Sequence, residues 1–271
     1  MCACGTPHTG GPLPASGGGQ SITVFAAASL SRVLPMEISA FERANPGVTA
    51  QGDYEGTQAL LTKLEADDTL ADVFVSADSA HMKTAQDKGL VATPHELATN
   101  SLVIAVPPGN PAHVATLADL ARSGLKLSIA DKSVPAGSYA EQAFAIAESN
   151  RDVPTGFAKQ ALANVATQPT DVETVVANVA SASVDAGIVY ATDALAGSGV
   201  AAVPIPQRDQ PVTAYFAAAT AAAPNPTAAQ AFVDFLLSPP GQSILQAAGF
   251  SPPSPTVQPL GGAPPTASAS P

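Results

Sequence analysis

Four short polar segments each lie where a helix is expected to begin, and their residues are the best suited to chemistry. The segments are FAAASL at Ser29, EGTQALL at Thr57, VPAGSYA at Ala136 and PTDVETVV at Val172. The first turn of a helix has backbone N–H groups without an intrahelical partner, with the positive end of the helix dipole behind them. Together the four segments therefore predict a site for an anion.

Taken singly, each of these polar residues is explained more simply as a helix cap, because Ser, Thr and Asp are common caps. Caps are expected at Ser29, at Thr57 and at either Thr170 or Asp171. Asp78 follows VFVSA and Asp193 follows GIVYAT, so both could act as acid or base groups. Capping of the helices that follow explains these two residues better.

The alternative chemistry is nucleophilic catalysis by Ser29 or Ser138. The sequence has no GxSxG elbow, no SxxK that begins at either serine and no GxxxxGK[ST] phosphate loop. No histidine is placed by a local signature to act as a base or to share a metal with a second ligand. We treat all four as surface residues: His8, His81, His95 and His113. We therefore expect no catalytic residue, no metal site and no cofactor.

The elements that must position these residues alternate between strands and helices, which predicts an α/β fold with largely parallel sheets. The predicted strands are Ile22 to Phe25, Val73 to Val75, Leu102 to Val106, Leu127 to Ala130, Ile188 to Tyr190 and Val212 to Phe216. Helical spacing relates Leu30, Leu34, Ile38 and Phe41. Pro35 interrupts this helix, so the helix either kinks there or has a different boundary.

Composition excludes several classes of function. The chain has 271 residues, a net charge of −11 and only 11 Lys and Arg, which argues against binding of nucleic acid. With no Trp and 5% aromatic residues, it has little material for stacking sugars or bases. The same acidity repels anions at long range, so an anion site must act through local dipoles.

The two ends of the chain are predicted to lie outside the folded body. Residues 1–20 are rich in Gly, Pro and Ser and indicate a flexible tether, while residues 251–271 indicate a disordered Pro-rich tail. Cys2 and Cys4 are too few for a closed metal site, and the segment that follows them is typical of a lipid-anchored tether. We expect lipidation at Cys4 or Cys2, with the secretion signal upstream of the printed sequence.

Seven motifs, read in order, resemble the periplasmic molybdate-binding proteins over residues 21–250. The motifs are ITVFAAASL, ADVFVSAD, NSLVIAV, VPAGSYA, DVETVVANV, AGIVYATDAL and FLLSPPGQSILQAAGF. The resemblance implies an α/β, two-lobed type II periplasmic-binding fold, in which each lobe is a mostly parallel sheet flanked by helices. Two strands that cross near Leu102 and Val212 would join lobe 1 (21–101 plus 213–250) to lobe 2 (102–212).

The resemblance also implies which groups bind the ligand. They are the hydroxyls and amides of Ser29 and Thr57, the amides of Ala136 and Val172, and the hydroxyl of Tyr190. All are neutral donors, as expected for an anion site in an acidic protein. The sequence departs from the family at Glu55 to Gln58, where the family often has a run of serines. We expect the Glu55 carboxylate to point to solvent.

The function implied is that of an extracytoplasmic, substrate-binding protein of an ABC importer. It would capture molybdate or tungstate between the lobes as a monomer and deliver it to a permease. It would bind no nucleic acid, would reach a membrane only through its lipid anchor, and would not be an enzyme. The same fold with another oxyanion such as sulfate remains an alternative, and a serine hydrolase is a second.

Overall fold

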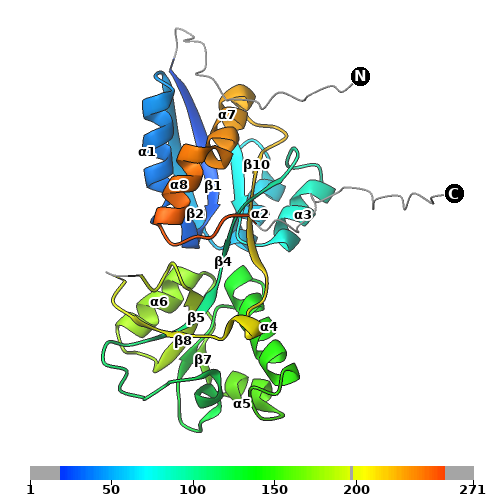
Figure 1. The fold of residues 1–271 in the computed structure, drawn as a ribbon. Helices are drawn as coiled ribbons and strands as arrows, with labels where there is room; N and C mark the ends of the chain where they lie inside the picture. Colours follow the sequence, from blue (N-terminus) through cyan, green and yellow to red (C-terminus); the bar gives the residue numbers. More distant parts are fainter. Residues whose placement is uncertain (1–18, 196–197, 254–271) are drawn as a thin grey trace, which may run out of the picture.

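The structure is a computed structural model that describes residues 19–195 and 198–253. Its two lobes are stacked one above the other in Figure 1, and each lobe is built on a five-stranded sheet. Cys2, Cys4 and most of the predicted tether and tail lie outside the described residues. Within the two described ranges, no helix is long and apolar enough to cross a membrane.

The sheet of lobe 1 has the strand order β2-β1-β3-β10-β4. Its strands are β1 (Gln20–Ala27), β2 (Val48–Glu55), β3 (Val73–Ser76), β4 (His95–Asn100) and β10 (Thr213–Ala219). The helices beside it are α1 (Leu34–Ala44), α2 (Thr57–Ala66), α3 (Ser79–Asp87), α7 (Pro226–Leu237) and α8 (Pro239–Ala247). The apolar side chains of α2, among them Leu60, Leu61 and Leu64, are buried in one cluster with Phe74 of β3 and Phe216 of β10. This packing fixes the first turn of α2 at the edge of the lobe that faces lobe 2.

The sheet of lobe 2 has the strand order β7-β6-β8-β5-β9. Its strands are β5 (Leu102–Val106), β6 (Leu127–Ser128), β7 (Val165–Thr167), β8 (Ala186–Tyr190) and β9 (Ala201–Pro204). The helices are α4 (Pro135–Ser149), α5 (Phe157–Ala163) and α6 (Val172–Ala180), with short 3-10 turns η2 (Leu117–Ala121) and η3 (Gln207–Asp209). The buried face of α6 carries Val172, Val175, Val176 and Val179, as the apolar spacing of the sequence predicts.

Two chain segments connect the lobes. β4 continues through Ser101 into β5, and the chain returns after η3 into β10. The Gln210 side chain pairs the two segments, because its amide oxygen accepts from the Leu102 N–H and its amide nitrogen donates to the Leu102 carbonyl, both at 2.8 Å. The two-lobed type II fold predicted from the resemblance is therefore confirmed.

The sheets are mixed rather than mostly parallel. In lobe 1, β1 runs parallel to β2 and β3, whereas β10 runs antiparallel to β3 and β4. In lobe 2, β6 runs parallel to β7 and β8, whereas β5 runs antiparallel to β8 and β9. The chain enters lobe 2 through β5 and returns to lobe 1 through β10, in each case directly from the other lobe. Because no crossover helix precedes these two strands, they are not constrained to run parallel to their neighbours.

The first helix begins later than the sequence pattern suggests. α1 begins at Leu34, so Pro35 lies in its first turn, where the missing N–H has no helical partner to lose. Leu30 belongs to a separate 3-10 turn, η1 (Ala28–Leu30). The conflict at Pro35 is resolved by the boundary and not by a kink.

Candidate anion site between the lobes

The structure brings all five predicted site residues to one small pocket between the lobes. Ser29, Thr57, Ala136, Val172 and Tyr190 all line it, and the remaining lining residues are Ala27, Ala28, Gly56, Ala77, Val134 and Pro135. No charged side chain is among them. The cavity volume is about 10 Å³, close to the smallest space that holds one water molecule. A pocket of this size suits a small inorganic ion and excludes an organic ligand of ordinary size.

Three helices direct their first turns at this pocket. Thr57 is the first residue of α2, Ala136 the second residue of α4 and Val172 the first residue of α6. The N–H groups at these positions have no intrahelical acceptor, and each helix adds the positive end of its dipole. Since α2 belongs to lobe 1 and α4 and α6 to lobe 2, the donors converge from both sides of the cleft.

The pocket contains three hydroxyl groups that are able to donate. The Thr57 hydroxyl accepts a hydrogen bond from the Ala77 N–H at 3.2 Å, which leaves its own hydrogen available. The Ser29 hydroxyl lies 2.9 Å from the Tyr215 hydroxyl. The Tyr190 hydroxyl is buried and has no hydrogen-bond partner in the described part of the chain. Burial raises the pKa of Tyr190 well above its usual value, so the hydroxyl keeps its proton. It is therefore a buried polar group that still needs a hydrogen-bond partner.

The capping predictions have mixed outcomes. Gly56, not Thr57, is the N-cap of α2, and Ser29 lies inside η1 without a capping hydrogen bond. Both predictions were wrong: the cap position of α2 is taken by Gly56, where a Cβ would meet the Thr170 carbonyl, and the Ser29 hydroxyl pairs with the Tyr215 hydroxyl instead of a backbone N–H. Asp171 is the cap of α6 and accepts from the Thr174 N–H at 2.7 Å.

Asp78 and Asp193 were both predicted to cap a helix, and only Asp78 does. Asp78 caps α3 as predicted, accepting from the His81 N–H at 2.8 Å. Asp193 caps no helix, because the chain after β8 forms turns. Its buried carboxylate accepts instead from the Tyr190 N–H at 3.1 Å, and burial raises its pKa well above its usual range. Asp193 therefore holds the backbone that carries the Tyr190 side chain, a role that no local sequence signal reveals.

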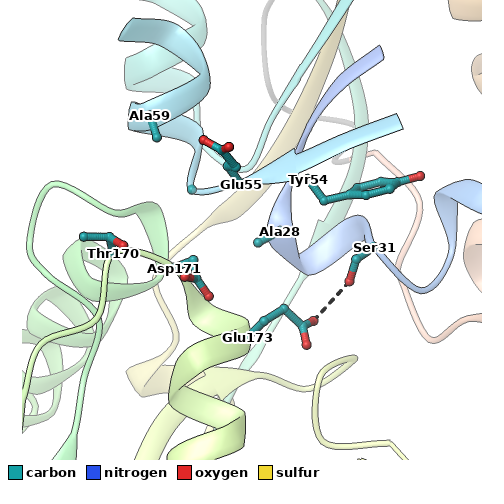
Figure 2. A pocket seen from close by; sticks show the side chains of 9 residues that line it. Ala28, Ser31, Tyr54, Glu55, Ala59, Thr170, Asp171 and Glu173 are labelled. Atoms are coloured by element: carbon teal, nitrogen blue, oxygen red, sulfur yellow. Dashed lines mark hydrogen bonds between the residues drawn. The ribbon is translucent and has the colours of Figure 1, made fainter. Parts of the chain in front are cut away.

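A larger cavity of about 370 Å³ adjoins the pocket and shares Ala28 and Gly56 with it. Figure 2 shows its acidic walls: Glu55 comes from the end of β2, and Asp171 and Glu173 come from the start of α6. The Glu55 carboxylate is 2.6 Å from the Lys63 ammonium and its side chain is 40% exposed. Glu55 thus lines the larger cavity and not the pocket of neutral donors.

The lobes are in contact across the cleft beside the pocket. The Gln58 amide donates to the Thr170 carbonyl at 2.7 Å. The Ser31 hydroxyl donates to the Glu173 carboxylate at 3.3 Å, as the dashed line in Figure 2 shows. A Cβ at Gly56 would lie 2.3 Å from the Thr170 carbonyl oxygen. The backbone of Gly56 is otherwise ordinary, with φ −58° and ψ 136°. Glycine is required here because the Thr170 carbonyl of the opposite lobe and the Gln58 side chain that donates to it leave no room for a Cβ.

Fold and pocket together define a class: a two-lobed α/β protein with a small pocket in the cleft between the lobes. Residues 22–251 match the family of bacterial extracellular solute-binding proteins. The chain belongs to this family.

Relatives of known function are similar over nearly the whole chain. The molybdate-binding protein ModA of Mycobacterium tuberculosis is 34% identical over 256 residues, which cover 93% of both chains. The molybdate-binding protein ModA of Escherichia coli is 30% identical, over 85% of this chain and 88% of its own.

Solved structures share the fold. The periplasmic molybdate-binding protein of Azotobacter vinelandii matches with a TM-score of 0.72 at 18% identity, over 86% of this chain and 100% of its own. The sulfate-binding protein SubI of Mycobacterium tuberculosis matches with a TM-score of 0.77 at 22% identity, over 87% and 88%. At these identities the structural similarity establishes the fold and not the ligand.

Proposed function

We propose that this protein is the molybdate-binding receptor of an ABC importer and that it delivers the oxyanion to a permease. The observation that carries the proposal is the pocket itself. It is small, is lined by neutral groups alone, and receives the first turns of three helices from both lobes. Such a site can hold a dianion without a countercharge.

The unsatisfied Tyr190 hydroxyl supports the same proposal. Leaving a buried donor unpaired costs about 1 to 3 kcal/mol, and an oxyanion in the pocket would supply the missing acceptor. The relatives that are 30% and 34% identical are molybdate-binding proteins, which favours molybdate over other tetrahedral anions. Tungstate, of the same shape and charge, is expected to bind as well.

Phosphate should be rejected for a chemical reason. Near neutral pH, phosphate carries a proton that needs an acceptor, whereas the pocket offers mainly N–H and O–H donors. Sulfate carries no proton, so it is the more serious competitor. Its smaller size is the property by which the pocket would have to distinguish it.

Calorimetric titration of the full chain with molybdate, tungstate, sulfate and phosphate tests the proposal. We expect tight binding of molybdate and tungstate, and far weaker binding of the other two. At 1,000 times its dissociation constant, a ligand stabilises the fold by about 4 kcal/mol, so the melting temperature should rise by several degrees. Equal affinity for sulfate and molybdate would show that the protein binds oxyanions in general and is not specific for molybdate. If none of the four anions binds, the proposal is rejected.

We further propose that the protein is a monomeric receptor outside the cytoplasm, without a resident cofactor and without enzymatic activity. No histidine lines the pocket around Ser29, so a serine nucleophile would lack a base there. A fluorophosphonate probe should therefore leave Ser29 unlabelled. Labelling of Ser29 would favour the hydrolase alternative.

Lipidation at Cys4 or Cys2 is part of the proposal for the native protein, with the tether allowing the lobes to reach the permease. Changing both cysteines to Ser should release the protein from the membrane fraction of its native host. Membrane association that survives the double change would contradict the anchor.

A further inference from the structure

A second tyrosine lies directly behind the pocket and contacts two of the proposed donors. Tyr215, on β10, is fully buried and does not line the pocket. Its hydroxyl is 2.9 Å from the Ser29 hydroxyl oxygen, and its ring centroid is 5.7 Å from that of Tyr190. Phe250 packs edge-on against the same ring, with 5.4 Å between centroids. The Tyr215 side chain is thus held between Phe250 and the two hydroxyl donors.

We propose that Tyr215 is a positioning and specificity-determining residue of the anion site. It donates a hydrogen bond to the Ser29 oxygen and thereby directs the Ser29 hydrogen into the pocket. This inference rests on the proposed function, because it assigns a direction to a hydrogen bond that matters only if the pocket binds an oxyanion.

The surroundings of Tyr215 hold the nearby Asn100 side chain in place and keep the tyrosine hydroxyl protonated. The Asn100 side-chain oxygen accepts from the Ser101 N–H at 2.9 Å, and its NH₂ group donates to the Thr192 hydroxyl at 2.9 Å. Burial raises the pKa of Tyr215 well above its usual value, so its hydroxyl keeps the hydrogen that it donates to Ser29 in this proposal.

The ligand imposes the same direction. A fully deprotonated tetrahedral dianion can only accept, so Ser29 must donate to it and must accept from Tyr215. A hydrogen phosphate ion would instead need an acceptor for its own proton. As long as Tyr215 occupies the Ser29 oxygen, Ser29 is a poor acceptor for that proton. Tyr215 therefore contributes to the exclusion of protonated oxyanions without touching them.

A double-mutant cycle with Ser29→Ala and Tyr215→Phe tests the proposal on the full-length protein. Tyr215→Phe keeps the ring that packs against Tyr190 and Phe250, and removes only the hydroxyl. We expect it to weaken binding of molybdate by about 5- to 20-fold, because it removes a hydrogen bond between neutral groups that orients a donor and not a contact with the ion itself. In the Ser29→Ala background, the same change should alter the affinity by less than about twofold. Binding of phosphate, relative to molybdate, should improve in Tyr215→Phe alone.

Thr220→Val is the matched control, because Thr220 is 3% exposed and its hydroxyl donates to the Ala71 carbonyl at 2.6 Å, inside lobe 1 and away from the pocket. It should lower stability without changing either the affinity or the preference between anions. If the losses of the two single variants multiply in the double variant, Tyr215 acts independently of Ser29 and the proposal is overturned. The cycle is run with whichever of molybdate and sulfate the parent binds more tightly, so an error in the ligand alone leaves the test intact. A parent that binds neither overturns this proposal together with the proposed function.

Discussion

The two adjoining cavities in the cleft share Ala28 and Gly56 but differ in their volume and in the charge of the residues that line them. The larger, of about 370 Å³, is lined by Glu55, Asp171 and Glu173. The smaller, of about 10 Å³, has no charged lining residue and lies at the first turns of α2, α4 and α6. A dianion is repelled by the first cavity and attracted by the second.

The size of a cavity alone therefore does not identify a ligand site. Large pockets suit organic ligands that bury apolar surface, whereas a small inorganic ion gains its binding energy from donors at short distance. The carboxylates are close enough to matter for the rate and strength of binding, but they belong to the mouth of the cleft. Substitutions at the two cavities should therefore affect anion binding differently.

Gly56→Ala is expected to cause the largest loss, because a Cβ at this position would lie 2.3 Å from the Thr170 carbonyl oxygen of the opposite lobe. The lobes could not close, and the pocket would lose donors from lobe 2. With more than one charge-assisted hydrogen bond lost, affinity for molybdate should fall by about a hundredfold or more in calorimetric titration. Gly19→Ala, where the nearest atom is 3.9 Å away, is the control and should bind like the parent. Unchanged affinity in Gly56→Ala would mean that ligand binding does not need this closure.

Val172→Pro removes the first amide of α6 while the helix remains compatible with the change. Pro is favoured at the first helical position, and the extended backbone of Asp171, at φ −154° and ψ 161°, suits the residue before a proline. We expect affinity to fall by about 10- to 100-fold.

Ser79→Pro provides a matched control for Val172→Pro. Ser79 is also the first residue of a helix, α3, after an Asp cap with φ −152° and ψ 164°, but it is exposed and does not line the pocket. The Ser79→Pro variant should bind molybdate with the same affinity as the parent. Equal losses in the two proline variants would point to general disturbance of the fold rather than to a ligand contact at Val172.

Tyr190→Phe should separate binding from stability. The unliganded protein should gain up to about 1 kcal/mol in thermal unfolding, because the variant removes a buried hydroxyl that has no partner in the described residues. Affinity for molybdate should nevertheless fall by about tenfold. A variant that is less stable and binds as tightly as the parent would show that the hydroxyl has a structural partner and no role toward the ligand.

Glu173→Gln addresses the acidic cavity and should have the smallest effect, in the opposite direction. The amide oxygen can still accept from Ser31, so the contact across the cleft is retained. Removing one negative charge at the mouth should raise affinity by about two- to threefold at low salt, and less at high salt. Asp234→Asn on α7, far from both cavities, is the control for net charge. A loss of affinity in Glu173→Gln would place this carboxylate in the binding site itself.

Sequence reasoning located the middle of each sheet and missed its edges. The central strands β1, β3 and β10 of lobe 1 and β5, β6 and β8 of lobe 2 were all predicted, although β6 is shorter than expected. The four missed strands, β2, β4, β7 and β9, are the edges of the two sheets. Edge strands are only partly buried and therefore lack a continuous apolar run: β2, for example, contains Gln51, Gly52 and Asp53.

The candidate site shows the same limit. The five residues taken from the family resemblance all line one pocket, because the motifs that carry them begin helices or end strands at the cleft. Their supports were not predictable. Tyr215 contacts Ser29 from a distant part of the sequence, and the requirement for glycine at position 56 comes from a carbonyl group in the other lobe. Asp193 lies only three residues from Tyr190, but the turn in which it accepts from the Tyr190 N–H has no sequence signal that separates it from a helix cap.

A crystal structure of the full chain grown with molybdate, with anomalous scattering used to locate molybdenum, tests the central claim most directly. We expect one strong anomalous peak in the small pocket, with oxyanion oxygens within hydrogen-bond distance of the Tyr190 hydroxyl and the Val172 N–H. A peak among Glu55, Asp171 and Glu173 in the larger cavity, or none in the cleft, would contradict the account.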